Sequence, residues 1–137
     1  MGWYYRLFAT DLEMILGNVN AGGEAVVTLL VRGLNGHIAN VQAVVDTGFT
    51  ENLTLPPWVI ERLKLAQRES DNYLLADGSK IEVRRFVAEV EWLGTWQRVL
   101  VVETESNPLL GMALMSGHHL GIDIMDGGRV EIRPLSS

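Results

Sequence analysis

The stretch "AVVDTGFTENLTLP", Ala43–Pro56, places a carboxylate, a hydroxyl and a glycine between two apolar segments. The β-branched residues before Asp46 predict a buried strand, and the alternation of Leu53 and Leu55 predicts a short strand after it. A carboxylate at the end of a buried strand is energetically costly unless it is hydrogen-bonded or shared. Gly48 allows backbone amides to approach that carboxylate closely, because no side chain stands between them.

Asp46-Thr47-Gly48 also has a simpler interpretation, because Asp, Thr and Gly are common turn residues. The position of the tripeptide at the end of an apolar strand favours a functional role over a plain turn. In addition, the Thr47 hydroxyl can both donate and accept a hydrogen bond, so it could tie two loops together.

Apolar segments and turn signals on both sides of this stretch predict further short elements. Strands are expected near residues 24–32 and 37–45, because the "GLNG" of residues 33–36 contains Asn-Gly, a strong hairpin signal. Pro57 is expected to open a short helix at its first turn.

A second hairpin is predicted over residues 72–83, "NYLLADGSKIEV", with Asp77-Gly78 at its tip. The apolar residues of its outgoing strand change parity, so a bulge or a departure from the sheet is expected near Arg84-Arg85. These two arginines are expected to lie on a solvated face.

The C-terminal part predicts a strand over residues 96–103, a brief helix near residues 112–119 and two short strands about the turn at residues 126–128. Short strands with one or two short helices, and no strand–helix alternation, predict an all-β domain, either a barrel or a sandwich. We expect a single domain over residues 21–137, preceded by an N-terminal arm or extension over residues 1–20.

Composition narrows the possible partners. The chain has 137 residues and a net charge of −6, which argues against a nucleic-acid partner and against docking on an anionic membrane. It contains no cysteine, which excludes disulfides, thiolate metal sites and a cysteine nucleophile and fits a reducing, cytoplasmic location. No stretch approaches the roughly 20 apolar residues of a membrane span.

Other chemical motifs are weak or missing. His118-His119 could suggest a metal site, but no Asp or Glu stands at the spacing of the usual helical motif, so no metal is expected. The sequence contains neither a Gly-x-Ser-x-Gly segment nor a phosphate- or dinucleotide-binding glycine pattern. We therefore expect no cofactor.

Three segments together resemble a known family. They are "AVVDTGFTENLTLP", the hairpin "LLADGSKIEV", and "PLLGMALM", which carries an apolar pair followed by glycine. In this order they are similar to the active-site loop, the flap and the hydrophobic-hydrophobic-Gly element of the retroviral-type (retropepsin-like) aspartic proteases, in particular their small bacterial relatives. The resemblance spans roughly Val26–Ile132.

The resemblance implies a closed-barrel-like retropepsin domain in which Asp46 is catalytic. It implies further site residues: loop support from Thr47, Gly48 and Thr50, a flap of Ala76, Asp77, Gly78 and Ser79, and structural support from Leu109, Leu110 and Gly111. In this family two facing carboxylates activate a water that attacks the peptide carbonyl. The ionised carboxylate acts as general base, and the protonated one donates to the carbonyl oxygen.

A single chain cannot supply both carboxylates, because Asp46 alone among the aspartates is followed by Thr-Gly or Ser-Gly. We therefore expect a homodimer in which each copy contributes Asp46 across a two-fold axis. The expected activity is that of an aspartic endopeptidase acting on an extended peptide or unfolded protein. The alternative is a catalytically weak or inactive protease-fold module for peptide binding or dimerisation, since a fold does not determine a function.

Overall fold

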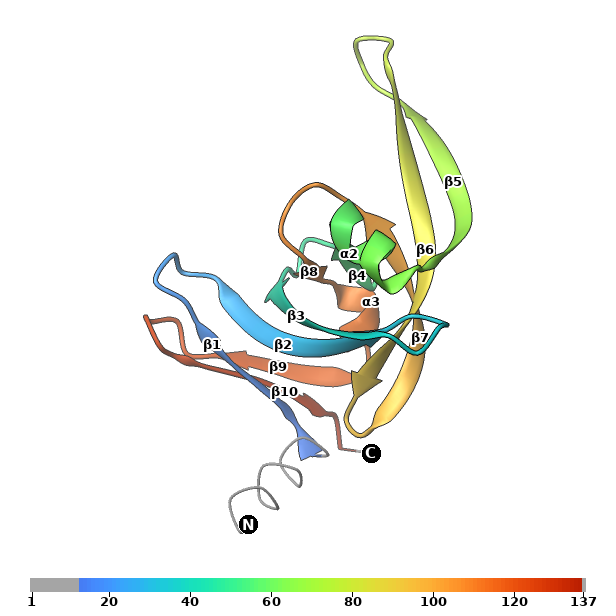
Figure 1. The fold of residues 1–137 in the computed structure, drawn as a ribbon. Helices are drawn as coiled ribbons and strands as arrows, with labels where there is room; N and C mark the ends of the chain where they lie inside the picture. The colour runs from blue at the N-terminus through green and yellow to red at the C-terminus, as the bar shows by residue number, and fades with distance from the viewer. Residues whose placement is uncertain (1–12, 137) are drawn as a thin grey trace.

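The computed structural model describes residues 13–136, which form ten strands and two short helices (Figure 1). In chain order they are β1 Ile15–Val19, β2 Ala25–Arg32, β3 Ile38–Val45, β4 Leu53–Leu55, α2 Pro57–Leu63, β5 Ala66–Leu74, β6 Lys80–Trp92, β7 Thr95–Glu103, β8 Leu109–Leu110, α3 Met112–Met115, β9 His118–Ile122 and β10 Arg129–Pro134. Within residues 13–136, no helix has the length and apolar character needed to span a membrane.

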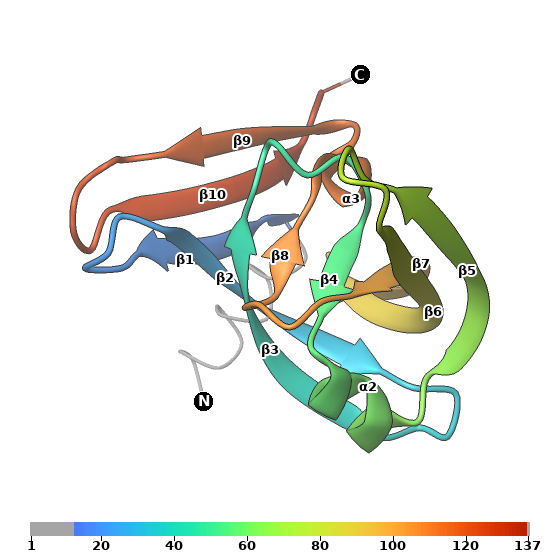
Figure 2. The ribbon, with the colours of Figure 1, turned by 90° about the horizontal axis from the view of Figure 1, so that it is seen from above.

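All ten strands belong to one sheet, in the order β5-β6-β7-β4-β8-β3-β2-β1-β10-β9. β2 also pairs with β6 through Val31–Val90 and Arg32–Glu89, which closes the middle strands into a ring. Figure 2 looks into this ring from above. The expected all-β, closed-barrel-like fold with short helices is therefore confirmed.

The core fills the ring because alternate residues of each strand point inward. Val31, Ala88, Val101 and Leu110 come from four different strands and are fully buried. Trp92 is the largest fully buried side chain, and its indole N–H donates to His118 Nε2 at 3.1 Å. Aliphatic packing thus holds the ring together, and the polar end of Trp92 is paired.

Local turn chemistry places the first elements where the sequence predicts them. β2 and β3 form an antiparallel hairpin in which Arg32 pairs with Ile38, and Gly36 adopts a φ of +86° in the turn. Such a positive φ favours glycine, as the Asn-Gly signal indicates. α2 begins at Pro57, as expected, because proline is well tolerated at the first helical position.

The β5–β6 hairpin extends beyond the rest of the sheet (Figure 1). β7 pairs with β6 only from Arg85 to Trp92, so Lys80–Arg84 has β5 as its only neighbour. The expected departure from the sheet near Arg84-Arg85 is confirmed. The associated register shift, however, lies between Gln67 and Glu69, on the partner strand β5.

The predicted helix near residues 112–119 is too long. α3 ends at Met115, and Gly117, with a φ of +82°, turns the chain into the next strand. His118 and His119 lie on β9, which pairs with β10 along its whole length. The two short strands about the turn at residues 126–128 are confirmed as β9 and β10.

The N-terminal segment is described only in part. β1 lies in the sheet between β2 and β10, with Gly17 paired to Val27 on one side and to Val130 on the other. Residues 1–12 lie outside the described residues. The predicted division into an arm over residues 1–20 and a domain over residues 21–137 therefore stays a prediction.

Candidate active site

The Asp46 loop, residues 46–52, connects the end of β3 to the start of β4. The Asp46 N–H donates to the Leu110 carbonyl at 2.9 Å, and the Asp46 carbonyl accepts from the Phe49 N–H at 3.1 Å. The Gly48 N–H donates to Asp46 Oδ1 at 2.8 Å. Asp46 is half-buried, whereas Thr47 and Gly48 are exposed. The turn therefore fixes the direction of a carboxylate whose surroundings remain open to solvent.

Gly48 is suited to this turn because it leaves room beside the carboxylate. A Cβ atom at this position would lie 3.2 Å from Asp46 Oδ1, a distance that is tighter than an ordinary van der Waals contact. A larger residue would therefore press on the same oxygen that the Gly48 amide orients. Thr50 lies further along the loop and is exposed.

β8 holds both ends of the loop. It runs between β3 and β4 (Figure 2), parallel to β3 with Val45 opposite Leu110, while Leu110 also pairs with Leu53 of β4. The Gly111 N–H continues this contact by donating to the Asn52 carbonyl at 2.9 Å. The start and the end of the loop are thus fixed to the same two-residue strand, which makes a firm support for Asp46.

Gly111 fits between backbone groups of the loop. A Cβ atom there would lie 2.1 Å from the Glu51 carbonyl oxygen and 2.5 Å from Phe49 Cδ2. The next residue, Met112, donates its N–H to the Phe49 carbonyl at 2.8 Å. Leu110 is fully buried beneath this contact, and Leu109 is half-buried. These three residues of the "LLG" segment therefore support the loop and present no reactive group.

Replacing Thr54 by Val is expected to lower the free energy of unfolding by about 1–3 kcal/mol. Thr54 is buried, and its Oγ1 accepts the Leu109 N–H at 2.8 Å, so valine would leave that amide without a partner. Denaturant unfolding at a fixed protein concentration measures the change. Thr28→Val, on the exposed face of β2, is the matched control and should change stability by less than about 0.5 kcal/mol. Equal losses in both variants would contradict the role of this hydrogen bond.

The predicted flap residues Ala76–Ser79 form the tip of the β5–β6 hairpin, and all four are exposed. Asp77 Oδ1 accepts both the Ser79 hydroxyl, at 2.6 Å, and the Ser79 N–H, at 2.9 Å. The bond from the Ser79 hydroxyl, followed by that from its amide, lowers the pKa of Asp77 below its ordinary value. Gly78 adopts a φ of +89° in this turn. The Asp77 carboxylate is therefore part of the turn itself.

An ion pair between the buried Arg85 and the partly exposed Glu51 joins the Asp46 loop to the base of the hairpin, and no local sequence pattern predicts it. The expectation that Arg85 lies on a solvated face is wrong, because Arg85 is buried. It donates through Nε to Glu51 Oε1 at 2.9 Å and through Nη2 to Oε2 at 3.0 Å. The same guanidinium contacts Asp71 and the Tyr73 hydroxyl. The signal in the sequence is slight: Glu51 is a second carboxylate in the loop, with no basic residue near it in sequence.

This contact changes the electrostatics of both partners. The hydrogen bonds from Arg85 lower the pKa of Glu51, although partial burial opposes the shift. The same bonds raise the pKa of Arg85 above its ordinary value, so this side chain stays charged throughout the working pH range of proteins. Glu51 is therefore committed to a structural ion pair, whereas Asp46 makes no ion pair with any residue of the described range 13–136.

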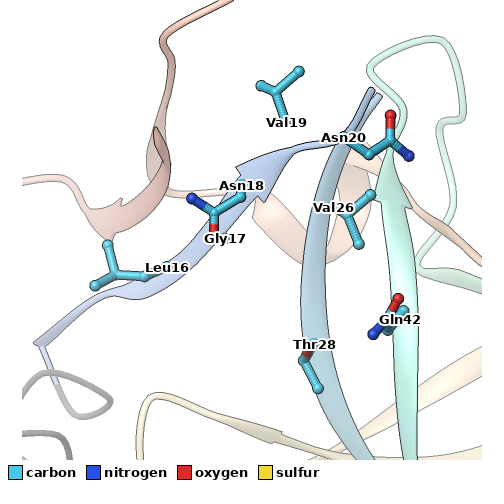
Figure 3. A pocket seen from close by; sticks show the side chains of 8 residues that line it. All are labelled: Leu16, Gly17, Asn18, Val19, Asn20, Val26, Thr28 and Gln42. Carbon is cyan, nitrogen blue, oxygen red and sulfur yellow. The ribbon is translucent and has the colours of Figure 1, made fainter. Parts of the chain in front are cut away.

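Other parts of the surface offer less chemistry. A shallow hollow of about 350 Å³ lies over β1, β2 and β3 (Figure 3). It is lined by Leu16, Gly17, Asn18, Val19, Asn20, Val26, Thr28 and Gln42, none of which is an acid or a base. In the described part of the chain, no group of three or more His, Asp or Glu side chains is arranged to hold a metal ion. The hollow over β1, β2 and β3 therefore offers no group for acid–base chemistry.

Comparisons with known proteins identify the fold. Neither a protein-family model nor a curated protein sequence matches the chain significantly. Among solved structures, a retropepsin-like aspartic protease from Rickettsia conorii matches with a TM-score of 0.57 and 17% identity, over 90% of this chain and 92% of that one. The EIAV protease complexed with the inhibitor HBY-793 matches with a TM-score of 0.49 and 16% identity, over 70% of this chain and 88% of that one. The likeness to the Rickettsia structure shows that this chain has the retropepsin-like fold.

Proposed function

We propose that this protein is an aspartic endopeptidase in which two copies of the chain each contribute Asp46 to one active site. The observation that carries the proposal is the carboxylate of Asp46, oriented by the Gly48 amide on a loop that β8 fixes at both ends. That loop occurs in the retropepsin-like fold, which aspartic proteases use. No cofactor is needed for the chemistry that follows.

The proposed reaction is the hydrolysis of a peptide bond by a water held between the two carboxylates. Two carboxylates placed against each other cannot both ionise at low cost, so the pair retains one proton. The ionised member takes a proton from the water as it attacks the carbonyl carbon, and the protonated member donates to the carbonyl oxygen. The roles then reverse when the leaving nitrogen is protonated and the C–N bond breaks.

The exposure of the loop supports a site shared between two copies. Thr47 and Gly48 are exposed on either side of a half-buried Asp46, so a second copy can approach the carboxylate without displacing the core. A closed two-fold dimer brings identical surfaces together, so a contact centred on this loop would place the two Asp46 residues beside the axis. The exposed Thr47 hydroxyl is then available to hydrogen-bond with the partner's loop.

The proposed substrate is an extended peptide or a segment of unfolded protein. It would lie as a strand between the loops and the β5–β6 hairpins, bonded through its backbone. The exposed hairpin tip, Ala76–Ser79, would close over the peptide and exclude water from the reacting bond.

Mixing wild-type chains with Asp46→Asn chains tests whether the site is shared. At a 1:1 ratio with free exchange, only about a quarter of the dimers carry two intact carboxylates, so activity per wild-type chain should fall to about half. Cleavage of an unfolded protein, measured alongside sedimentation, provides both the rate and the oligomeric state.

An Asp126→Asn chain is the control partner, because Asp126 lies in the exposed turn before β10. Because this variant keeps Asp46, every mixed dimer stays intact, so the activity per total chain should be unchanged and the activity per wild-type chain should double. Activity that is insensitive to the Asp46→Asn partner under conditions where the protein sediments as an exchanging dimer would exclude a shared site.

A peptide-binding module without turnover is the second candidate, and the edge of the sheet favours it. β5 is an edge strand, and Tyr73 and Leu74 on it are large exposed apolar residues. An extended peptide can add to such an edge without any chemistry at Asp46. Peptide binding that is equal in the wild type and in Asp46→Asn, with no cleavage by either from acid to neutral pH, would support this candidate.

A further inference from the structure

Arg85 lies at the point where the β5–β6 hairpin leaves the sheet. It is the last residue of β6, towards the tip, that pairs with β7, where its partner is Val102. Beyond it the hairpin has two strands only, with every residue from Ser70 to Glu82 exposed. A two-stranded ribbon is marginally stable by itself in water, so contacts at its base matter for its placement.

The side chain of Arg85 contacts both the hairpin and the Asp46 loop. On the loop side, its two bonds to the two oxygens of the Glu51 carboxylate form a bidentate pair. On the hairpin side it contacts Asp71 and the Tyr73 hydroxyl, both on β5. A second ion pair on the same strand, Arg84 to Glu103 with Nε–Oε1 at 2.8 Å, joins β6 to β7 and does not reach the loop.

We propose that Arg85 is a positioning residue that couples the placement of the β5–β6 hairpin to the Asp46 loop through its bidentate contact with Glu51. The carboxylate and the hairpin that would cover a bound peptide are thereby held in one geometry. This inference rests on the proposed function for its catalytic consequence, but the mechanical coupling itself can be measured without any activity.

The geometry favours coupling over a general contribution to stability. The Arg85 side chain is buried, and a guanidinium bonded at two points resists rotation in a way that a single contact does not. Glu51 is itself fixed, because its carbonyl accepts the Ala113 N–H at 3.2 Å at the start of α3. Movement of the hairpin base is therefore transmitted through Arg85 to Glu51, whose backbone is hydrogen-bonded to α3.

Hydrogen exchange tests the coupling. A substitution in the Asp46 loop is followed at the amides of the hairpin, and a substitution at the hairpin base is followed at the amides of the loop. Glu51→Gln should raise exchange of the hairpin amides 70–82 about tenfold, and Arg85→Met should raise exchange of the loop amides 47–52 to a similar extent. Glu103→Gln and Arg84→Met remove the neighbouring ion pair and are the matched controls. They should change the same amides by less than about twofold.

A double variant shows whether the two substitutions act through the same contact or independently of each other. If Arg85 acts through Glu51, the variant Glu51→Gln/Arg85→Met should show no more exchange than either single variant. Additive increases, or increases equal to those of the Arg84 and Glu103 controls, would overturn the proposal. These outcomes are independent of catalysis and can be obtained in the Asp46→Asn background, so they do not depend on the proposed function.

Peptide cleavage supplies the catalytic part of the test. Arg85→Lys retains the charge without the bidentate geometry, and we expect it to lower kcat/KM about tenfold while Arg84→Lys leaves it within twofold. If the variants lose exchange protection but kcat/KM does not change, the coupling between hairpin and loop is supported and its role in the reaction is contradicted. Absence of cleavage by every variant, including the wild type, would contradict the proposed function alone.

The pH dependence of the coupling follows from the groups around Glu51. Arg85 faces it, and the same guanidinium also contacts Asp71 and the Tyr73 hydroxyl. The hydrogen bonds from Arg85 lower the pKa of Glu51. A carboxyl whose pKa is lowered by folding stabilises the folded state fully at pH values above its ordinary pKa of 4.5. This contribution is lost as the pH falls through the pKa of the folded state. The difference in exchange between the wild type and Glu51→Gln should therefore disappear under strongly acid conditions and be full at neutral pH.

Discussion

Replacing Asp46 by Asn is expected to lower the rate of peptide cleavage by about 1,000-fold or more. The substitution removes both the general base and the general acid of the proposed reaction, each of which contributes about 100- to 10,000-fold. Cleavage of an unfolded protein or of a peptide library, followed by mass spectrometry from acid to neutral pH, measures the loss.

The fold should survive this substitution, which makes the result interpretable. The side-chain oxygen of asparagine can still accept the Gly48 N–H that Asp46 Oδ1 accepts at 2.8 Å. Asp126→Asn is the matched control, because it makes the same chemical change in an exposed turn, and it should retain full activity. Equal cleavage by the wild type and by Asp46→Asn would show that another group performs the hydrolysis and would end the proposal.

Replacing Gly111 by Ala is expected to lower the free energy of unfolding by about 3 kcal/mol or more. The new methyl group would stand 2.1 Å from the Glu51 carbonyl oxygen, and neither backbone can move freely. The Gly111 N–H donates to the Asn52 carbonyl, and the Leu110 carbonyl accepts the Asp46 N–H. Any shift that relieves the clash therefore disturbs the Asp46 loop, so cleavage should also fall.

Gly121→Ala provides the control for the Gly111 substitution. Gly121 lies on β9, where a Cβ atom would meet His119 Nε2 at 3.6 Å, an ordinary contact. This variant should keep its stability within about 0.5 kcal/mol. Both variants need the same protein concentration in denaturant unfolding, because a dimer is stabilised by mass action. A stable, active Gly111→Ala protein would contradict the close packing of β8 against the loop.

The elements that could be predicted from the sequence are those whose causes are local. The Asn-Gly of the β2–β3 turn, the proline that opens α2 and the Asp77-Gly78 tip each set a backbone geometry within a few residues. The apolar strand that ends at Asp46 is also readable in this way. The helix after Gly111 was overestimated, because pairing of His118 and His119 with β10 outweighed the local pattern.

The contacts that unite the site depend on segments far apart in the chain. No local pattern could reveal that β8 lies between β3 and β4, or that Arg85 of β6 meets Glu51 of the loop. The burial of Arg85 contradicts the expectation that an Arg-Arg pair is solvated, because its charge is neutralised by partners that only the folded sheet brings near.

The strand that carries Asp46, the glycine beside it and the turns that divide the chain all follow from the preferences of neighbouring residues, so they can be read from short segments of the sequence. Which strands close the ring, and which charged side chain holds the hairpin to the loop, depend on the folded chain as a whole. Pairing between distant strands is selected by burial of the whole apolar core, a sum over many residues that no short segment contains.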